Sequence, residues 1–237
     1  MGNNKSYQNC LVIFLIHVTL TFSEKCPERP ETLLGLTTPI ANSSTDAQYR
    51  TSLNSIMSEA YTFLQEQQNL LKNGCFKPKS CKPISKTLVI VPYRNREEHL
   101  NIFLIHMHQF LQRQQIEYCI VVSEQKNKGK FNKGILMNGA FEETKLFFDF
   151  ECVVFHDVDM IPEDDRNIYS CKERNGEFKS PIHLSTQINK YNYKYPYGTD
   201  FGGVTMLSRK QYRKFVIAHL LETFRKLKIL SLSRFSV

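Results

Sequence analysis

The sequence contains no tryptophan and only ten glycines among its 237 residues. It has no internal repeat, which excludes architectures that stack short repeated units. No apolar run reaches the roughly twenty residues that an ordinary transmembrane helix requires. The longest such run is the leader Cys10–Phe22, which His17 interrupts. After the leader, about two hundred residues remain, enough for one domain with a sizeable core.

The leader predicts entry into the secretory pathway. It is short for a membrane span, and Thr21 with Ser23 supply small residues that suit cleavage of a signal peptide. On these residues alone, a cleaved signal peptide and an uncleaved signal-anchor both remain open. Asn42 begins the glycosylation sequon Asn42-Ser43-Ser44, which would face the lumen in either case.

The formal net charge is +8, but the positive charge is unevenly distributed. From Thr205 to the last residue, eight basic side chains are opposed by one acid, Glu222, so this part alone contributes +7. Its final stretch, Val216–Val237, has the pattern of a basic amphipathic helix. Because the rest of the chain is nearly neutral, we expect no nucleic-acid partner.

The middle of the chain alternates between two hydrophobic periodicities. Three apolar runs of strand length are separated by two segments in which apolar residues recur at helical spacing. The order is β-α-β-α-β, which predicts an open α/β sheet. The predicted strands are Lys86–Pro92, Tyr118–Val122 and Val153–Phe155, and the predicted helices are Glu97–Phe110 and Ile135–Glu143.

The most informative segment is Cys152–Pro162, an apolar run that ends in two carboxylates, Asp157 and Asp159. In open α/β sheets, ligands bind beyond the carboxyl ends of strands, so a nucleotide site is expected here. Alternate residues of an extended chain point to opposite faces, so only one aspartate contacts a metal unless the chain turns. Carboxylate oxygens suit Mg²⁺, Ca²⁺ or Mn²⁺. On these residues alone, a turn or a cap remains the more common explanation.

Two further segments have side chains suited to ligand binding. Arg94 and Arg96, in the turn after the first predicted strand, are suited to phosphate, although a solvated surface turn would look the same. The tyrosine-rich segment Gln187–Val204 ends in Gly202-Gly203. Aromatic faces stack on sugars and glycines permit close backbone approach, but an edge hairpin remains the alternative.

Four short segments occur together in a fixed order: Pro92–Arg96, Phe131–Lys133, Phe155–Pro162 and Phe201–Val204. In order and spacing they resemble the β-1,4-galactosyltransferase family of Golgi enzymes, from about residue 26 to residue 215. The resemblance implies a GT-A-like, Rossmann-type nucleotide-sugar-binding fold with Mn²⁺ as cofactor. It implies transfer of galactose or GalNAc from UDP-galactose or a related UDP-sugar, with inversion, to a GlcNAc-terminated acceptor.

The resemblance also implies roles for individual residues. Asp159 would bind the metal, and Asp157 would face the nucleotide sugar. The family more often has arginine at position 133, so Lys133 keeps the charge without the planar fork. Asp200 occupies the position that helps to select the sugar. The residues expected to bind the UDP-sugar are Pro92, Tyr93, Arg94, Arg96, Phe131, Lys133, Asp157 and Lys190.

The cysteines fit the same family. The resemblance implies two disulfides, Cys26–Cys81 and Cys152–Cys171. Closing a loop of about twenty residues in this way is worth about 3 kcal/mol. Of the other cysteines, Cys119 is interpreted as a packed thiol in a strand, and Cys75 has no evident partner.

Disulfides indicate an oxidising compartment. Because the family uses an uncleaved signal-anchor, the resemblance favours a single-pass type II protein of the Golgi membrane with a lumenal domain. Secretion after signal cleavage is the alternative.

The resemblance ends at Phe215. The family continues into a segment that contains two tryptophans, the catalytic base and further metal ligands, none of which this sequence contains. We therefore expect a C-terminally truncated fold with most of the donor-binding half and little transferase activity. Two functions stay open, a galactosyltransferase and an inactive UDP-sugar-binding or partner protein. The expected regions are 1–25 (tail and signal-anchor), 26–85 (N-terminal region), 86–215 (UDP-sugar-binding region) and 216–237 (atypical basic tail).

Overall fold

The computed structural model describes residues 24–37, 58, 62, 74–173, 176–177, 180–194 and 202–214. Several predictions of the sequence analysis lie outside these residues, among them the leader, the sequon at Asn42, the sugar-selecting position Asp200 and the basic tail. Within the described part, no helix is both long enough and apolar enough to cross a membrane.

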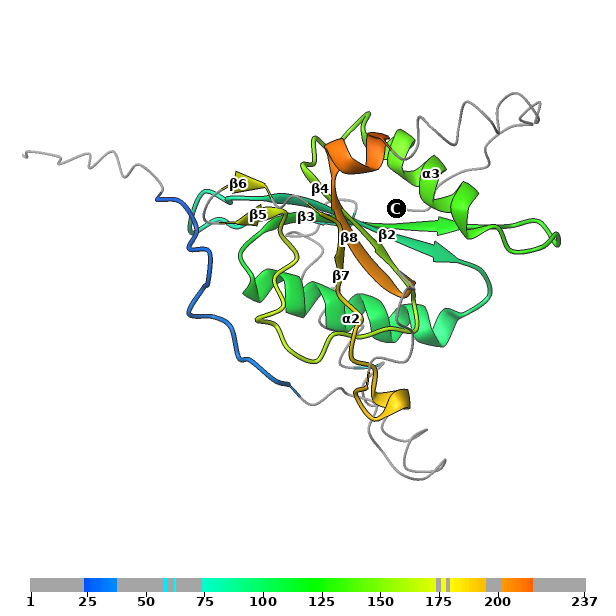
Figure 1. Cartoon of the computed structure of the whole chain (residues 1–237), viewed down its shortest axis with the longest axis horizontal. Coiled ribbons are helices and arrows are strands. Elements are labelled where there is room, and N and C mark those ends of the chain that lie inside the picture. The colour runs from blue at the N-terminus through cyan, green and yellow to red at the C-terminus, as the bar shows by residue number, and fades with distance from the viewer. Residues whose placement is uncertain are drawn as a thin grey trace, which may run out of the picture.

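A mixed six-stranded sheet forms the centre of the described structure (Figure 1), with strand order β1-β3-β2-β4-β8-β7. Its parallel part is β3-β2-β4, and β1, β8 and β7 add to the two edges in antiparallel fashion. The strands of this sheet are β1 (Cys75–Phe76), β2 (Lys86–Tyr93), β3 (Glu117–Glu124), β4 (Cys152–His156), β7 (Ile182–His183) and β8 (Val204–Ser208). The remaining elements are α2 (Glu97–Arg113), α3 (Lys133–Thr144), η1 (Asn189–Tyr191) and the small ribbon of β5 (Lys172–Glu173) and β6 (Gly176–Glu177).

The two crossover helices lie on opposite faces of the sheet (Figure 1). Helix α2 connects β2 to β3 in one direction along the sheet, and α3 leads from β3 back past β2 to β4. Because β-α-β crossovers are almost always right-handed, reversing the direction puts the second helix on the other face. The predicted β-α-β-α-β order and element types are therefore confirmed.

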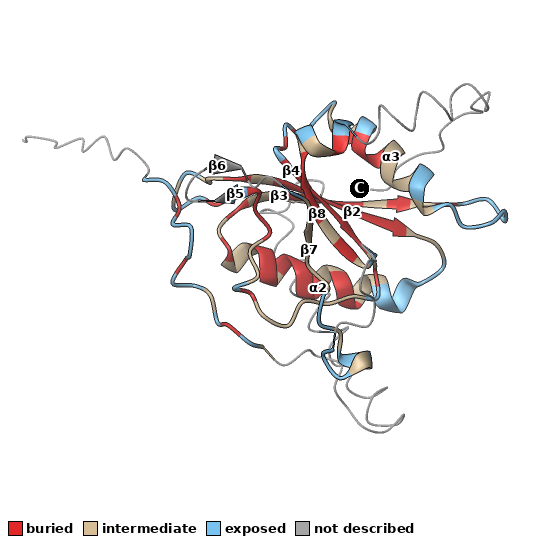
Figure 2. Cartoon of the chain, in the orientation of Figure 1, coloured by how far each residue is buried: buried red, intermediate tan, exposed pale blue. Residues whose placement is uncertain are grey.

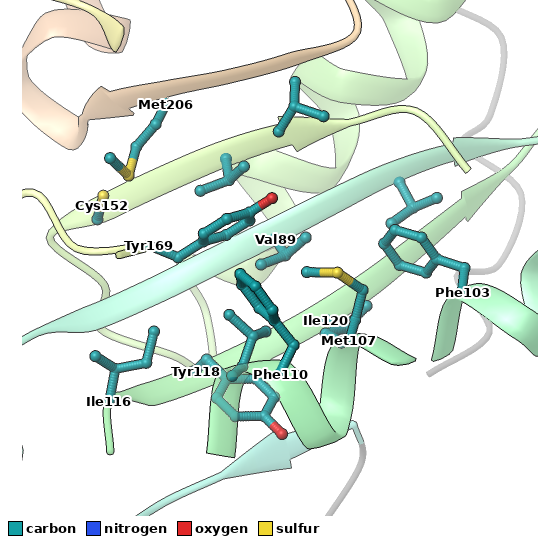
Figure 3. Close-up of a cluster of buried hydrophobic side chains, with 14 of the residues drawn as sticks. Val89, Phe103, Met107, Phe110, Ile116, Tyr118, Ile120, Cys152, Tyr169 and Met206 are labelled. Atoms are coloured by element: carbon teal, nitrogen blue, oxygen red, sulfur yellow. The ribbon is translucent and has the colours of Figure 1, made fainter. Parts of the chain in front are cut away.

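Both faces of the central strands are buried, which explains why these strands read as continuous apolar runs. Successive residues of β2 alternate between two cores: Val89 and Val91 pack on the α2 side, and Leu88 and Ile90 on the α3 side. On the α2 side, the helix contributes Phe103, Met107 and Phe110 (Figure 3). Figure 2 shows that the buried residues follow these central strands and α2.

The described residues form three disulfide bonds. The two pairs that the family resemblance implied, Cys26–Cys81 and Cys152–Cys171, are both present. The interpretation of Cys119 as a packed thiol and of Cys75 as unpartnered is wrong, because these two residues form the third disulfide. Strand β1 pairs with β3 so that Cys75 lies directly opposite Cys119, with 4.0 Å between their Cα atoms. Only the strand register brings them together.

The acidic segment Glu163-Asp164-Asp165, which follows β4, is only partly solvated. Asp165 is fully buried and forms an ion pair with Arg113 at 2.7 Å. Its carboxylate also accepts the backbone N–H groups of Leu34 and Gly35, at 3.0 and 2.7 Å. Burial raises the pKa of Asp165, but these hydrogen bonds outweigh it and hold the pKa below its ordinary value. One carboxylate therefore joins the N-terminal segment to α2 and to the loop after β4.

This arrangement predicts very different effects for two adjacent substitutions. Asp165→Asn leaves the partly buried Arg113 without its charge partner and should lower the free energy of unfolding by about 3 kcal/mol. Asp164→Asn removes an exposed ion pair with Arg166 and should cost less than about 1 kcal/mol. Urea unfolding of the two variants at pH 7 measures both. Equal losses would show that Asp165 is not an anchor of the fold.

Candidate functional site

A pocket of about 360 Å³ lies at the carboxyl ends of the parallel strands. Strands β2 and β4 pair only as far as Ile90 and Phe155, and β2 continues to Tyr93 without β4 beside it. This is also the point where the direction of the crossovers reverses, the usual ligand position in an open α/β sheet. The residues that line the pocket are Pro92, Arg94, Arg96, Phe131, Lys133, Asp157, Val158 and Asp159.

One wall of the pocket comes from the turns after β2 and β3. The guanidinium of Arg94 donates to the carbonyl of Gly129 at 2.6 Å and lies 5.3 Å from the centre of the Phe131 ring. Phe131 is 41% exposed, so an apolar ring face is available at the pocket. A cation beside an accessible ring suits a flat, polar ligand group such as a nucleobase.

Gln125, a buried residue that the sequence analysis missed, holds this wall. Its amide oxygen accepts the N–H of Asn132 at 2.8 Å, and its amide nitrogen donates to Asn127 and Lys130 at 2.8 and 3.0 Å. Asn132 in turn caps α3 by accepting the N–H of Ile135. Gln125 follows β3 directly, and a long polar side chain at the carboxyl end of a central strand was the available signal.

The opposite wall is the Asp157–Asp159 turn. The chain turns immediately after β4, because Met160 N–H donates to the carbonyl of Asp157 at 3.2 Å. The alternation rule for extended strands therefore stops applying, and both carboxylates line the same pocket. The N–H of Asp157 donates to the carbonyl of Gly203 at 3.0 Å, so the turn is also held by the start of β8.

Each of the two carboxylates is paired with a base from the other wall. Asp159 forms an ion pair with Arg96 at 2.6 Å, and Asp157 with Lys133. Three cationic and two anionic side chains line the pocket, which leaves a small positive excess for an anionic ligand. The site is thus electrostatically suited to a phosphate-containing ligand together with a divalent cation.

The donor set fits a hard divalent cation in a particular way. The Asp159 carboxylate is 44% exposed at the pocket, whereas Oδ1 of Asp157 is buried and contacts the ammonium group of Lys133. In the described residues, no three His, Cys, Asp or Glu side chains gather around one point. Such ions are commonly held by one or two carboxylates plus the phosphates of a nucleotide, and this chain supplies that partial set.

Two predicted site residues that the structure describes, Tyr93 and Lys190, are not among the residues that line the pocket. The Tyr93 hydroxyl accepts the N–H of Arg96 at 3.3 Å, so it supports the basic turn. Lys190 lies in η1 with its ammonium group 5.7 Å from the centre of the Tyr191 ring. Asp200 is outside the described residues. The ligand roles of all three stay predictions.

His156, the last residue of β4, is a second support that the sequence analysis missed. It is fully buried, and its Nδ1 lies 3.0 Å from the carbonyl of Asp157. A carbonyl can only accept, so Nδ1 carries the proton and Nε2 accepts from the Tyr169 hydroxyl at 3.0 Å. Burial lowers the pKa of His156 to about 4. A neutral imidazole therefore holds the backbone that carries Asp157.

The two adjacent glycines allow a matched test of how the Asp157 turn is held. Gly203 has a φ of +78°, and a Cβ there would lie 2.5 Å from Ser185 Oγ and 3.3 Å from Met160 Cε. At Gly202 a Cβ would meet open space. Gly203→Ala should therefore lower the free energy of unfolding by about 2 kcal/mol, and Gly202→Ala by less than about 0.5 kcal/mol. Thermal unfolding of both variants is the measurement. Equal stability would contradict the conclusion that close packing at Gly203 holds the Asp157 turn.

The buried histidines predict loss of stability in mild acid. Burial lowers the pKa of both His156 and His108 to about 4, so between about pH 4 and pH 6.5 only the unfolded chain binds their protons. Unfolding free energy should be greatest above pH 6.5 and fall toward pH 4 by at most about 1.4 kcal/mol per unit for each histidine. Urea titrations across this range measure the slope. His156→Asn should reduce the slope.

Comparison with known proteins gives two family matches. Residues 26–172 match the N-terminal region of glycosyl transferase group 7, and residues 182–215 match the N-terminal domain of galactosyltransferase. The second match ends at residue 215, where the resemblance seen in the sequence also ends. Together the matches cover the whole described site.

Individual relatives agree with the family matches. Mouse β-1,4-galactosyltransferase 6 is 40% identical to this chain over 156 residues, and human β-1,4-galactosyltransferase 3 is 37% identical over 189 residues. These alignments cover 66% and 80% of this chain, but the chain spans only 39% and 44% of the relatives' own lengths.

Among solved structures, the chain is similar to Drosophila β-1,4-galactosyltransferase 7 in complex with manganese, UDP-Gal and xylobiose. The sequence identity is 29%, the TM-score is 0.46, and the match covers 55% of this chain and 52% of that one. On the family matches and the identities to curated relatives, this chain belongs to glycosyl transferase group 7, the family that includes the β-1,4-galactosyltransferases.

Proposed function

We propose that this chain is the donor-binding part of a β-1,4-galactosyltransferase, which transfers galactose or GalNAc from a UDP-sugar, with inversion, to a GlcNAc-type acceptor. The observation that carries the proposal is the pocket itself. Three segments from different turns, Pro92–Arg96, Phe131–Lys133 and Asp157–Asp159, each contribute side chains to one cavity. This convergence supports a GT-A-like nucleotide-sugar site.

In the proposed complex, each wall of the pocket binds a different part of the donor. The ring of Phe131, with the cation of Arg94 beside it, would contact the uracil. Arg96 and Lys133 would bind the diphosphate, because both are cations at the opening of the pocket. Asp157 would face the sugar.

The exposed Asp159 carboxylate in the pocket also supports Mn²⁺ as the cofactor, with Asp159 as its protein ligand. When bound, such an ion offsets the negative charge that develops on the departing nucleoside diphosphate. We assign no catalytic base among the pocket residues, since both carboxylates are already paired with cations. A lumenal location in the Golgi, with a membrane anchor in the leader, belongs to the same proposal.

Calorimetry on the purified chain tests the donor site directly. UDP should bind in the high-micromolar to millimolar range, and Mn²⁺ should tighten the binding. Arg94→Ala should weaken UDP binding about tenfold, the factor expected for one hydrogen bond to a charged group. Arg166→Ala removes an exposed arginine that pairs with Asp164 and does not line the pocket, so it serves as the matched control.

The proposal fails if the folded chain binds no UDP, or if both arginine variants bind it as tightly as the parent.

A further inference from the structure

We propose that Arg96 and Asp159 form an exchangeable ion pair that couples nucleotide binding to cation binding in the pocket. While the pair is closed, Arg96 occupies the carboxylate that a cation would bind, and Asp159 occupies the guanidinium that a diphosphate would bind. A nucleoside diphosphate that takes Arg96 frees Asp159 for a divalent cation, and a cation that takes Asp159 frees Arg96. The inference rests on the proposed function, because it assigns the same pocket to the same ligands.

The ion pair between Arg96 and Asp159 is accessible enough for ligands to displace it. Its atoms lie 2.6 Å apart, yet the side chains of Arg96 and Asp159 are 52% and 44% exposed. An ion pair this accessible to water contributes at most about 1 kcal/mol, so a stronger ligand can displace either partner. The backbone N–H of Arg96 is held separately by the Tyr93 hydroxyl, so the guanidinium can move while the turn stays in position.

The other charged residues of the pocket are held more firmly. Asp157 and Lys133 also form an ion pair, but the Asp157 side chain is only 22% exposed and its backbone is bonded to Gly203. Arg94 donates to a carbonyl and stacks on Phe131, and no salt bridge of Arg94 is formed in the described residues. Arg96 is therefore the pocket cation that an exposed carboxylate holds back from an incoming anion.

The coupling has an unusual consequence for the metal ligand. A substitution that removes a metal ligand normally weakens nucleotide binding, because the metal bridges protein and phosphate. Without metal, removing the Asp159 carboxylate should instead strengthen nucleotide binding, since Asp159 then acts only as a competitor of the diphosphate for Arg96. Coupling between two ligands is reciprocal, so the same pair must also oppose binding of the cation alone.

The test is UDP calorimetry in excess EDTA on the full chain and on Asp159→Asn, Arg96→Gln and the double variant. Asp159→Asn should bind metal-free UDP about threefold to fivefold more tightly than the parent, the factor that corresponds to an exposed ion pair. In the Arg96→Gln background, the same Asp159→Asn change should give no such gain. The double-mutant cycle thereby separates release of Arg96 from simple removal of a repelling charge.

Glu97→Gln provides a matched control, because it removes an exposed carboxylate next to Arg96 without breaking the pair. It should change metal-free UDP affinity by less than about twofold, a limit set by screening at ordinary salt. With Mn²⁺ added, the parent should gain UDP affinity and Asp159→Asn should not. Far-ultraviolet circular dichroism and thermal unfolding verify that each variant is folded.

Two results would overturn the coupling while leaving the donor site intact. One is an Asp159→Asn affinity no greater than that of the parent in EDTA. The other is an equal gain in the Arg96→Gln background, which would mean general charge repulsion. If neither the parent nor any variant binds UDP, with or without Mn²⁺, the proposed function is refuted together with this inference.

Discussion

The parallel pairing of β2 with β4 ends at Ile90 and Phe155, and the pocket lies directly beyond that point. While the two strands are paired, their backbone groups bond to each other and their side chains pack into the two cores. Past the last pair, β2 runs on to Pro92, which has no N–H to leave unsatisfied. Meanwhile, the chain after β4 turns. The sheet can therefore present side chains from both strands to one cavity.

The loops around this opening are held by buried polar side chains. Gln125 bonds to four residues of the loop before α3, and Gln114 bonds to the backbone of residues 165, 167 and 169 in the loop after β4. Asp165 and His156 add an ion pair and a neutral imidazole from within the core. Because a buried polar group is costly to leave unpaired, each of these side chains constrains the backbone that it contacts. The precision of the pocket thus comes from groups behind it.

The pocket neutralises most of its own charge. Bases from the turns after β2 and β3 pair with acids from the turn after β4, across the same cavity where a nucleotide diphosphate and a cation would bind. Such pairing limits repulsion among the three cations of the pocket. It also means that the affinity for either ligand depends on how easily a pair opens, and exposure makes the Arg96 pair the easier of the two.

The sequence by itself determined the β-α-β-α-β order and the positions of the central strands and helices. Of the eight residues that line the pocket, six had been predicted from the sequence to bind the UDP-sugar, and a seventh, Asp159, to bind the metal. These features are local, because periodicity and motif spacing follow directly from the order of residues along the chain. The tertiary structure alone decided the rest. The Cys75–Cys119 disulfide depends on strand register, and the burial of Asp165 beside the more accessible Asp164 depends on an N-terminal segment about 130 residues away. Likewise, both aspartates face one pocket only because the chain turns after β4 under a hydrogen bond to Gly203, a contact between segments that are distant in sequence.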